Sequence, residues 1–123
     1  MAAPLADRHC VDCKPGTPQL PLDEVERLLQ QVDGWAVEAV ELDDRHQQLE
    51  KIFKFKGFMP AVDLVNRIAA IAEAEGHHPD LQVSYGSLTV QLWTHTAGGL
   101  TDNDFILAAK IDQVAGPLPL PTP

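Results

Sequence analysis

The stretch Pro60–Leu92, PAVDLVNRIAAIAEAEGHHPDLQVSYGSLTVQL, decides the fold of this chain. Its first half places apolar residues at helical spacing, and its second half alternates apolar with polar residues. We therefore predict a helix from Pro60 to about Glu75. Gly76 closes this helix with a left-handed cap, and Pro79 cannot continue it.

The second half of the stretch predicts a β-hairpin. Leu81, Val83 and Tyr85 alternate as one strand, and Gly86-Ser87 is a two-residue turn signal. A second strand follows from Leu88 and ends at His95. Short hairpins of this kind favour an antiparallel sheet.

The same unit, a helix followed by a hairpin, is expected once before this stretch, and a further helix is expected after it. The segments are a helix over 22–32 ended by Asp33-Gly34, strands over 35–40 and 46–55 around a turn at Asp43-Asp44, and a last helix that Thr101 caps.

This order, α-β-β-α-β-β-α, predicts an α+β fold with two layers. A four-stranded, mainly antiparallel sheet carries three helices on one face. Residues 22–115 form this domain. Residues 1–21 are expected to be an N-terminal extended or loosely attached arm, and the Pro-rich residues 116–123 a disordered tail.

Composition limits the classes of function. The chain has 123 residues and a formal net charge of -9, which argues against binding to nucleic acid. Polar or charged residues interrupt every apolar run, so no membrane span is expected. The N-terminus lacks the apolar core of a secretory signal. A cytoplasmic protein is the expectation.

Cys10 and Cys13 stand in a Cys-x-x-Cys spacing within the arm. A zinc site needs about four ligands, and only His9 stands close by in the sequence. A redox motif needs a helix after it, whereas Lys14-Pro15-Gly16 is a turn sequence. An inert pair is favoured, and a metal or disulfide role stays open.

Three histidines are candidates for proton chemistry near neutral pH. His77 and His78 follow the end of a predicted helix, whose dipole favours a positive charge there, and Glu73 lies one turn earlier. His95 ends a strand before a glycine loop, where active-site residues are common. A helix-capping role for the pair and a zinc site of three histidines are the alternatives.

Two further residues have both a structural and a functional interpretation. Trp93 either packs on the sheet or stacks on a flat ligand. Asp104 stands at the third position of the last helix in a capping-box pattern with Thr101. Capping is the simpler role of Asp104, and it does not exclude a second role in orienting a histidine.

At these residues the sequence resembles the pterin-4a-carbinolamine dehydratase family, over roughly residues 22–115. The motif is an acidic residue, three residues, His-His-Pro, five residues, an aromatic residue, nine residues and His, with Asp further on. In this chain it reads Glu73-Ala-Glu-Gly-His77-His78-Pro79, then Tyr85, His95 and Asp104. The Cys-x-x-Cys arm is similar to the N-terminal extension of some bacterial members.

The resemblance implies dehydration of 4a-hydroxytetrahydropterin to the quinonoid dihydropterin, which recycles the cofactor of aromatic amino acid hydroxylases. It also implies a homodimer or homotetramer, no metal and no bound organic cofactor. A partnership with such a hydroxylase is a further expectation.

The resemblance also implies roles for individual residues. His77 and His95 are the acid–base candidates, His78 helps to bind the pterin, and Asp104 orients or polarises a histidine. The implied catalytic set is therefore His77, His78, His95 and Asp104, and the implied substrate-binding set is Glu73, His78, Pro79, Trp93 and Thr94.

Two other functions remain alternatives. One is a non-catalytic protein-interaction module that keeps the fold, although the intact histidines argue against it. The other is a pterin-handling protein in another pathway, such as molybdenum cofactor metabolism.

Overall fold

The computed structural model describes residues 4–11, 16–40 and 46–115. Its elements are a 3₁₀ helix Leu5–Asp7, α1 Leu22–Leu29, β1 Ala36–Val40, β2 His46–Lys54, α2 Met59–Glu75, β3 Asp80–Ser84, β4 Ser87–Leu92 and α3 Asp102–Ala115. The expected turn at Asp43-Asp44, the residue Cys13 and the Pro-rich tail lie outside the described residues.

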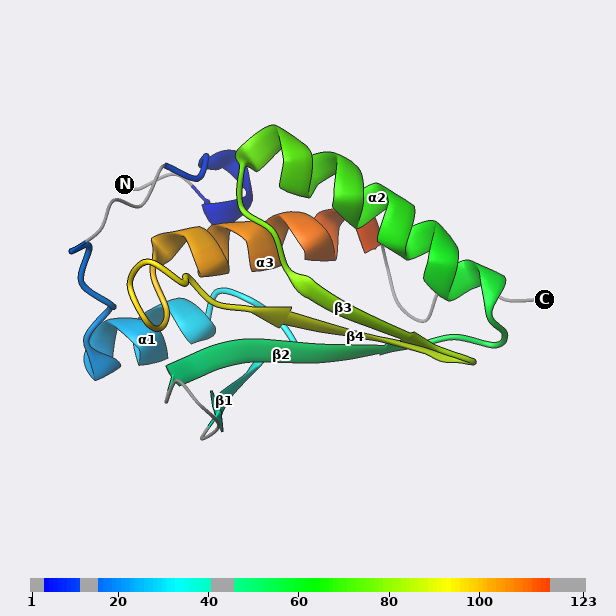
Figure 1. Ribbon diagram of the computed structural model, residues 1–123, viewed down its shortest axis with the longest axis horizontal. Coiled ribbons are helices and arrows are strands. Elements are labelled where there is room, and N and C mark those ends of the chain that lie inside the picture. The colour runs from blue at the N-terminus through cyan, green and yellow to red at the C-terminus, as the bar shows by residue number, and fades with distance from the viewer. Residues whose placement is uncertain (1–3, 12–15, 41–45, 116–123) are drawn as a thin grey trace.

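The four strands form one sheet in the order β1-β2-β4-β3, and every neighbouring pair is antiparallel. Helices α2 and α3 lie together on one side of this sheet (Figure 1). The predicted α+β fold and its element order are therefore confirmed.

The hydrophobic core fills the space between the sheet and the helices. Alternate residues of β2 and β4 point into it because successive side chains of a strand face opposite sides. All three α-helices contribute buried side chains to this single cluster. The largest of the fully buried side chains include Phe53, Phe105, Leu28, Leu49, Leu64, Ile68, Leu88 and Leu92.

Helix α2 has the ends that the sequence predicts. Pro60 stands in its first turn, where the missing N–H costs nothing. Gly76 adopts the left-handed conformation, with φ of 67°, and its N–H donates to the carbonyl of Ala72 at 2.9 Å. This cap directs the chain away from the helix at His77.

Helix α1 is shorter than the predicted range of 22–32. It ends at Leu29, and the chain tightens there because the N–H of Gln31 donates to the carbonyl of Leu28, three residues back. Gly34, with φ of 79°, then turns the chain toward β1, which begins at Ala36.

The second hairpin differs from its prediction in its turn and in the end of its second strand. Its turn is Tyr85-Gly86 rather than Gly86-Ser87, because Ser84 pairs with Ser87 and Gly86 takes the positive φ of 81°. Strand β4 ends at Leu92, so His95 stands in the following loop and not at a strand end.

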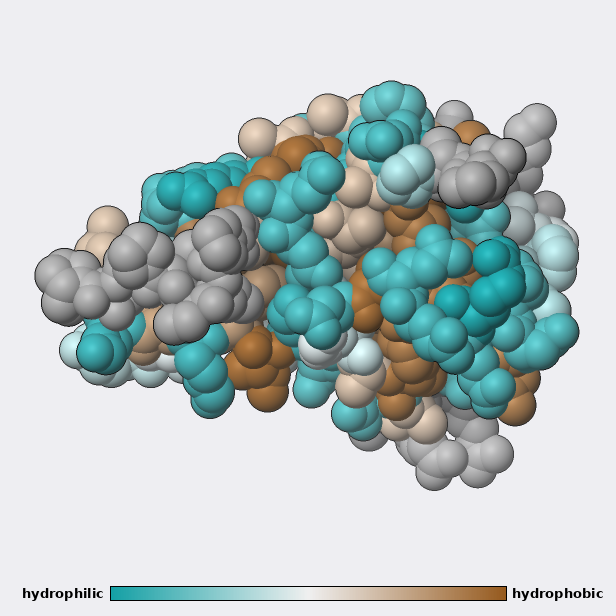
Figure 2. Space-filling model, turned by 180° about the vertical axis from the view of Figure 1, so that it is seen from behind, coloured by the Kyte–Doolittle hydropathy of each residue, from teal (hydrophilic) through white to brown (hydrophobic). Residues whose placement is uncertain are grey.

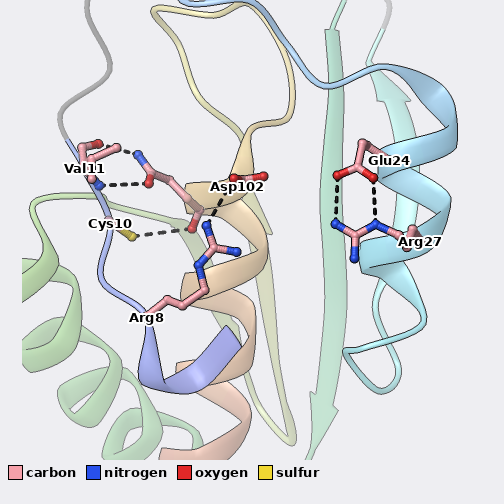
Figure 3. A network of polar contacts seen from close by, with 7 residues as sticks. Arg8, Cys10, Val11, Glu24, Arg27 and Asp102 are labelled. Atoms are coloured by element: carbon pink, nitrogen blue, oxygen red, sulfur yellow. Dashed lines mark hydrogen bonds and ion pairs between the residues drawn. The ribbon is translucent and has the colours of Figure 1, made fainter. Parts of the chain in front are cut away.

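The described part of the N-terminal arm packs on the helical layer, whereas the sequence suggests an extended or loosely attached arm. Leu5 is buried in the core, and the 3₁₀ helix lies against α3. Arg8 pairs with Asp102, with 3.2 Å between Nη2 and Oδ2 (Figure 3). The arm thereby reaches the first turn of α3.

The surface is mixed in character. Seen from behind, hydrophilic and hydrophobic residues alternate in small areas (Figure 2). Within the described ranges, every helix falls short of the length and apolar character that a membrane span needs.

Candidate active site

A cavity of about 420 Å³ opens at one end of the molecule. The C-terminal end of α2, the loop after β4 and the first turn of α3 meet at this end, beside the N-terminal arm (Figure 1). The residues that line the cavity are Val11, Gly76, His77, His78, Trp93, Thr94, His95, Thr96 and Asn103. All three predicted histidines are therefore brought together.

His77 is the most enclosed of the three histidines, with 12% of its side chain exposed. Its Nε2 lies 2.6 Å from Oδ1 of Asp104. A carboxylate can only accept, so Nε2 of His77 carries the proton in this pair. The other ring nitrogen, Nδ1, is therefore the one that can exchange a proton with a substrate.

Asp104 is fully buried and has further partners. Its Oδ2 accepts the backbone N–H of Thr101 at 2.9 Å, which is the return half of a capping box. The same oxygen accepts the hydroxyl of Thr94 at 2.9 Å, and that hydroxyl also lies 2.8 Å from the hydroxyl of Thr101. Asp104 thus caps α3 with one oxygen and contacts His77 with the other, an arrangement that is compatible with both interpretations of this residue.

His78 also lines the cavity but is more exposed than His77. Its Nε2 lies 2.5 Å from Oε2 of Glu73, and both side chains are mostly exposed. The sequence suggests Glu73 as a neighbour of His77, whereas the structure pairs it with His78. Neither Glu73 nor Pro79 lines the cavity. Glu73 contacts a residue that does line it, His78.

His95 and Trp93 form a stacked pair at the mouth of the cavity. Their ring centroids are 3.8 Å apart, with 23° between the ring planes. Backbone bonds of the loop place them, because the N–H of Thr94 donates to the carbonyl of Gly99 at 2.8 Å and turns the chain back. The exposed imidazole of His95 thus lies on the same cavity as His77.

Cys10 stands outside the cavity and is not activated. Burial, followed by the negative charges of Glu75 and Asp104, raises the pKa of its thiol to about 12. Among the residues that the structure describes, no three His, Cys, Asp or Glu side chains are grouped so that they could hold a metal ion.

Sequence reasoning misses Val11 and Asn103 as lining residues. Val11 comes from the arm, more than 60 residues before the histidines in the chain. Asn103 stands in the same first helical turn as Asp104 and gives no motif of its own. Only the three-dimensional packing of the arm reveals both.

The arrangement suits proton transfer at two points. One imidazole is fixed by a buried carboxylate, and a second lies exposed on the same cavity. Histidine can act as a general acid or a general base near neutral pH. Trp93, stacked on His95, adds an aromatic side chain to the lining of the cavity.

Comparison with known proteins shows the family of the chain. A sequence model of the family described as pterin 4 alpha carbinolamine dehydratase matches residues 18–114. Curated relatives carry the name pterin-4-alpha-carbinolamine dehydratase as a provisional assignment. One from Rubrobacter xylanophilus is 42% identical and covers 89% of this chain and 97% of its own. One from Rickettsia bellii is 44% identical and covers 88% and 91%.

Solved structures are also similar to this chain. A protein from Brucella melitensis, described as a transcriptional coactivator/pterin dehydratase, is 32% identical. It covers 80% of this chain and 99% of its own, with a TM-score of 0.68. A pterin dehydratase-like RuBisCO assembly factor shares the fold, with a TM-score of 0.55 at 21% identity. The family match and these relatives together show that the chain belongs to the pterin-4-alpha-carbinolamine dehydratase family.

Proposed function

We propose that this protein dehydrates 4a-hydroxytetrahydropterin to quinonoid dihydropterin in tetrahydropterin recycling, by acid–base catalysis with histidine. The hydroxyl on C4a leaves as water after it takes a proton from an acid, and a ring nitrogen gives a proton to a base. The products are the quinonoid dihydropterin and one water molecule.

The single observation that carries the proposal is the pair of His77 with buried Asp104 on the cavity. A carboxylate that accepts from one nitrogen of an imidazole fixes the orientation and the tautomer of the ring. Nδ1 of His77 can then deliver a proton to the leaving hydroxyl or take one from the ring.

His95 supplies the second group. It is exposed on the same cavity and is held in place by stacking on Trp93. With His77 and His95 on the same cavity, one imidazole acts as the acid while the other acts as the base. His78, paired with Glu73 at the rim, contributes to binding.

The test is the decay of 4a-hydroxytetrahydropterin in a stopped-flow instrument. We expect the wild-type protein to accelerate the decay. We expect His77→Ala and His95→Ala each to lower kcat by roughly 10²- to 10⁴-fold, which is the usual contribution of a positioned acid or base. His78→Ala should mainly raise KM.

A matched histidine control is His9→Gln. His9 lies outside the cavity, and glutamine can keep its hydrogen bond to Glu75. This variant should retain the wild-type kcat. No acceleration by the wild-type protein, or full activity in both His77→Ala and His95→Ala, would sink the proposed function.

A further inference from the structure

The N-terminal arm is fastened to the end of the molecule that holds the candidate active site. The backbone N–H of Cys10 donates to Oε1 of Glu75 at 2.7 Å, at the last residue of α2. Arg8 pairs with Asp102 at the first residue of α3 (Figure 3). The arm therefore bridges the two helix ends that border the cavity.

The backbone of Val11 forms two hydrogen bonds with a single side chain, that of Asn103. Its N–H donates to Oδ1 of Asn103 at 3.0 Å, and its carbonyl accepts from Nδ2 of Asn103 at 2.6 Å. Asn103 is 4% exposed, so this amide is a fixed part of the interior. The backbone of Val11 is thus fixed, yet 71% of the residue is exposed.

Val11 and Asn103 stand between two hollows. Both line the cavity of about 420 Å³ that holds the histidines. Both also line a second hollow of about 220 Å³, whose other walls include Thr17, Pro18 and Leu20. These two residues therefore border both the cavity of the histidines and the smaller hollow, which lies between the arm and the first turn of α3.

We propose that Val11 is a specificity-determining residue, which contacts the substituent of a bound pterin and directs it toward the smaller hollow. This inference rests on the proposed function. It concerns a residue outside the segment that the family model matches, which begins at residue 18. The isopropyl group of Val11 supplies apolar contact at a mouth otherwise rich in polar side chains.

Val11 is expected to distinguish pterins because they share the same ring but differ in its substituent. The planar ring meets His77, His95 and Trp93, which act alike on every reduced pterin. Only a substituent long enough to leave the ring region passes Val11. Loss of the two methyl groups of Val11 should therefore weaken binding of a long substituent and leave a short one unaffected.

The test compares two substrates, 4a-hydroxytetrahydrobiopterin with its dihydroxypropyl substituent and the analogue with a methyl group in its place. For Val11→Ala we expect KM of the first to rise about fivefold, as a lost apolar contact of this size predicts. KM of the methyl analogue and both kcat values should stay within about twofold of the wild type. The matched control is Asp7→Ala, which changes an exposed arm residue outside both hollows.

Equal changes with both substrates, or no change with either, would overturn the role of Val11. A shift in Asp7→Ala like that of Val11→Ala would also overturn it, because it would reveal a general effect of the arm. The same pair of substituents is tested by fluorescence titration with stable 7,8-dihydropterins, where the same shift is expected in Kd.

The titration separates this inference from the proposed function. A wild-type protein that dehydrates neither substrate but shows the Kd shift in Val11→Ala would refute the dehydratase and support the role of Val11. A wild-type protein that neither dehydrates nor binds these pterins would refute both.

Discussion

Asp104 serves the helix and the candidate active site with two different oxygens. Oδ2 accepts from Thr101 and Thr94, while Oδ1 meets His77. Because these bonds fix the carboxylate, the imidazole of His77 has little freedom to turn. The cap of α3 and the position of the His77 imidazole therefore depend on the same side chain.

Asp104→Asn separates these roles. An amide keeps the size of the side chain but places an NH₂ against donors, so at least one buried donor loses its acceptor. We expect kcat to fall roughly 10²- to 10⁴-fold, as when a histidine loses its orienting carboxylate. We expect the free energy of unfolding to fall by about 1–3 kcal/mol.

Stopped-flow kinetics and urea unfolding measure the two effects. Asp63→Asn is the control, because Asp63 is exposed on α2 and pairs only with Arg67 among the contacts described. It should change neither quantity appreciably. Wild-type kcat in Asp104→Asn would show that His77 does not need this carboxylate.

Cys10 should be a poor nucleophile in the folded protein. Burial, with Glu75 and Asp104 next, raises the pKa of its thiol from 9.0 to about 12, so thiolate at pH 8 falls by about 10³-fold. In a Cys13→Ser variant, mass spectrometry should show far slower alkylation by iodoacetamide in buffer than in urea. Similar rates in both conditions would contradict this expectation.

At the scale of the elements, periodicity predicts which segments are helices and strands, but local bonds decide where they end. The strand prediction continues to His95 because Trp93 and His95 keep the alternation. The structure stops β4 at Leu92, since Thr94 pairs with Gly99 instead of continuing the ladder. Such a return of the chain depends on contacts that a residue pattern does not contain.

The glycine turns allow a matched comparison. Gly76 and Gly86 both have positive φ, of 67° and 81°. A Cβ on Gly76 would meet nothing within 4 Å, whereas one on Gly86 would lie 3.2 Å from the carbonyl oxygen of Phe55. Gly76→Ala should therefore lower the free energy of unfolding by about 1–2 kcal/mol, the backbone cost alone. Gly86→Ala should cost more.

Urea unfolding of the two variants gives both values. Equal losses would mean that the hairpin turn can move away from Phe55 at no cost. The comparison therefore tests the packing of the Tyr85-Gly86 turn against the segment after β2, where the N–H of Phe55 donates to the carbonyl of Gly86.

For the molecule as a whole, the docking of the arm is the part of the structure that the sequence does not predict. The histidines and Asp104 could be identified because they recur in a spaced motif. Val11 and Asn103 could not, because their contact joins residues 92 positions apart and involves one backbone and one unremarkable amide. The arm also has few apolar residues that would predict its docking. Among its described residues, Leu5 alone is buried in the hydrophobic core.

Glu75 links the arm to helix α2 and makes the stability of this docking depend on pH. Its side chain is 8% exposed, and burial alone would raise the pKa of the carboxyl. The N–H of Cys10, together with His9 and Lys110, instead holds this pKa below the ordinary value of 4.5. Ionised Glu75 therefore stabilises the fold above pH 4.5, and the contribution is lost as pH falls through the lowered value.

Glu75→Gln should thus differ most from the wild type in free energy of unfolding at pH 6–7, and the difference should shrink below pH 4.5. Urea titrations at several pH values measure it. Glu26→Gln, an exposed position on α1, is the control and should show little difference at any pH. A difference for Glu75→Gln that stays constant from pH 7 to pH 3 would contradict the expected linkage.

The two tryptophans of the chain occupy opposite environments, and this gives the molecule two separate optical reporters. Trp35 is buried, and its indole N–H donates to Asp112. Trp93 stacks on His95 at the mouth of the cavity. Emission from a Trp93→Phe variant therefore follows unfolding of the core, whereas emission from a Trp35→Phe variant follows events at the cavity. Folding and ligand binding can then be read by fluorescence in the same protein without an added dye.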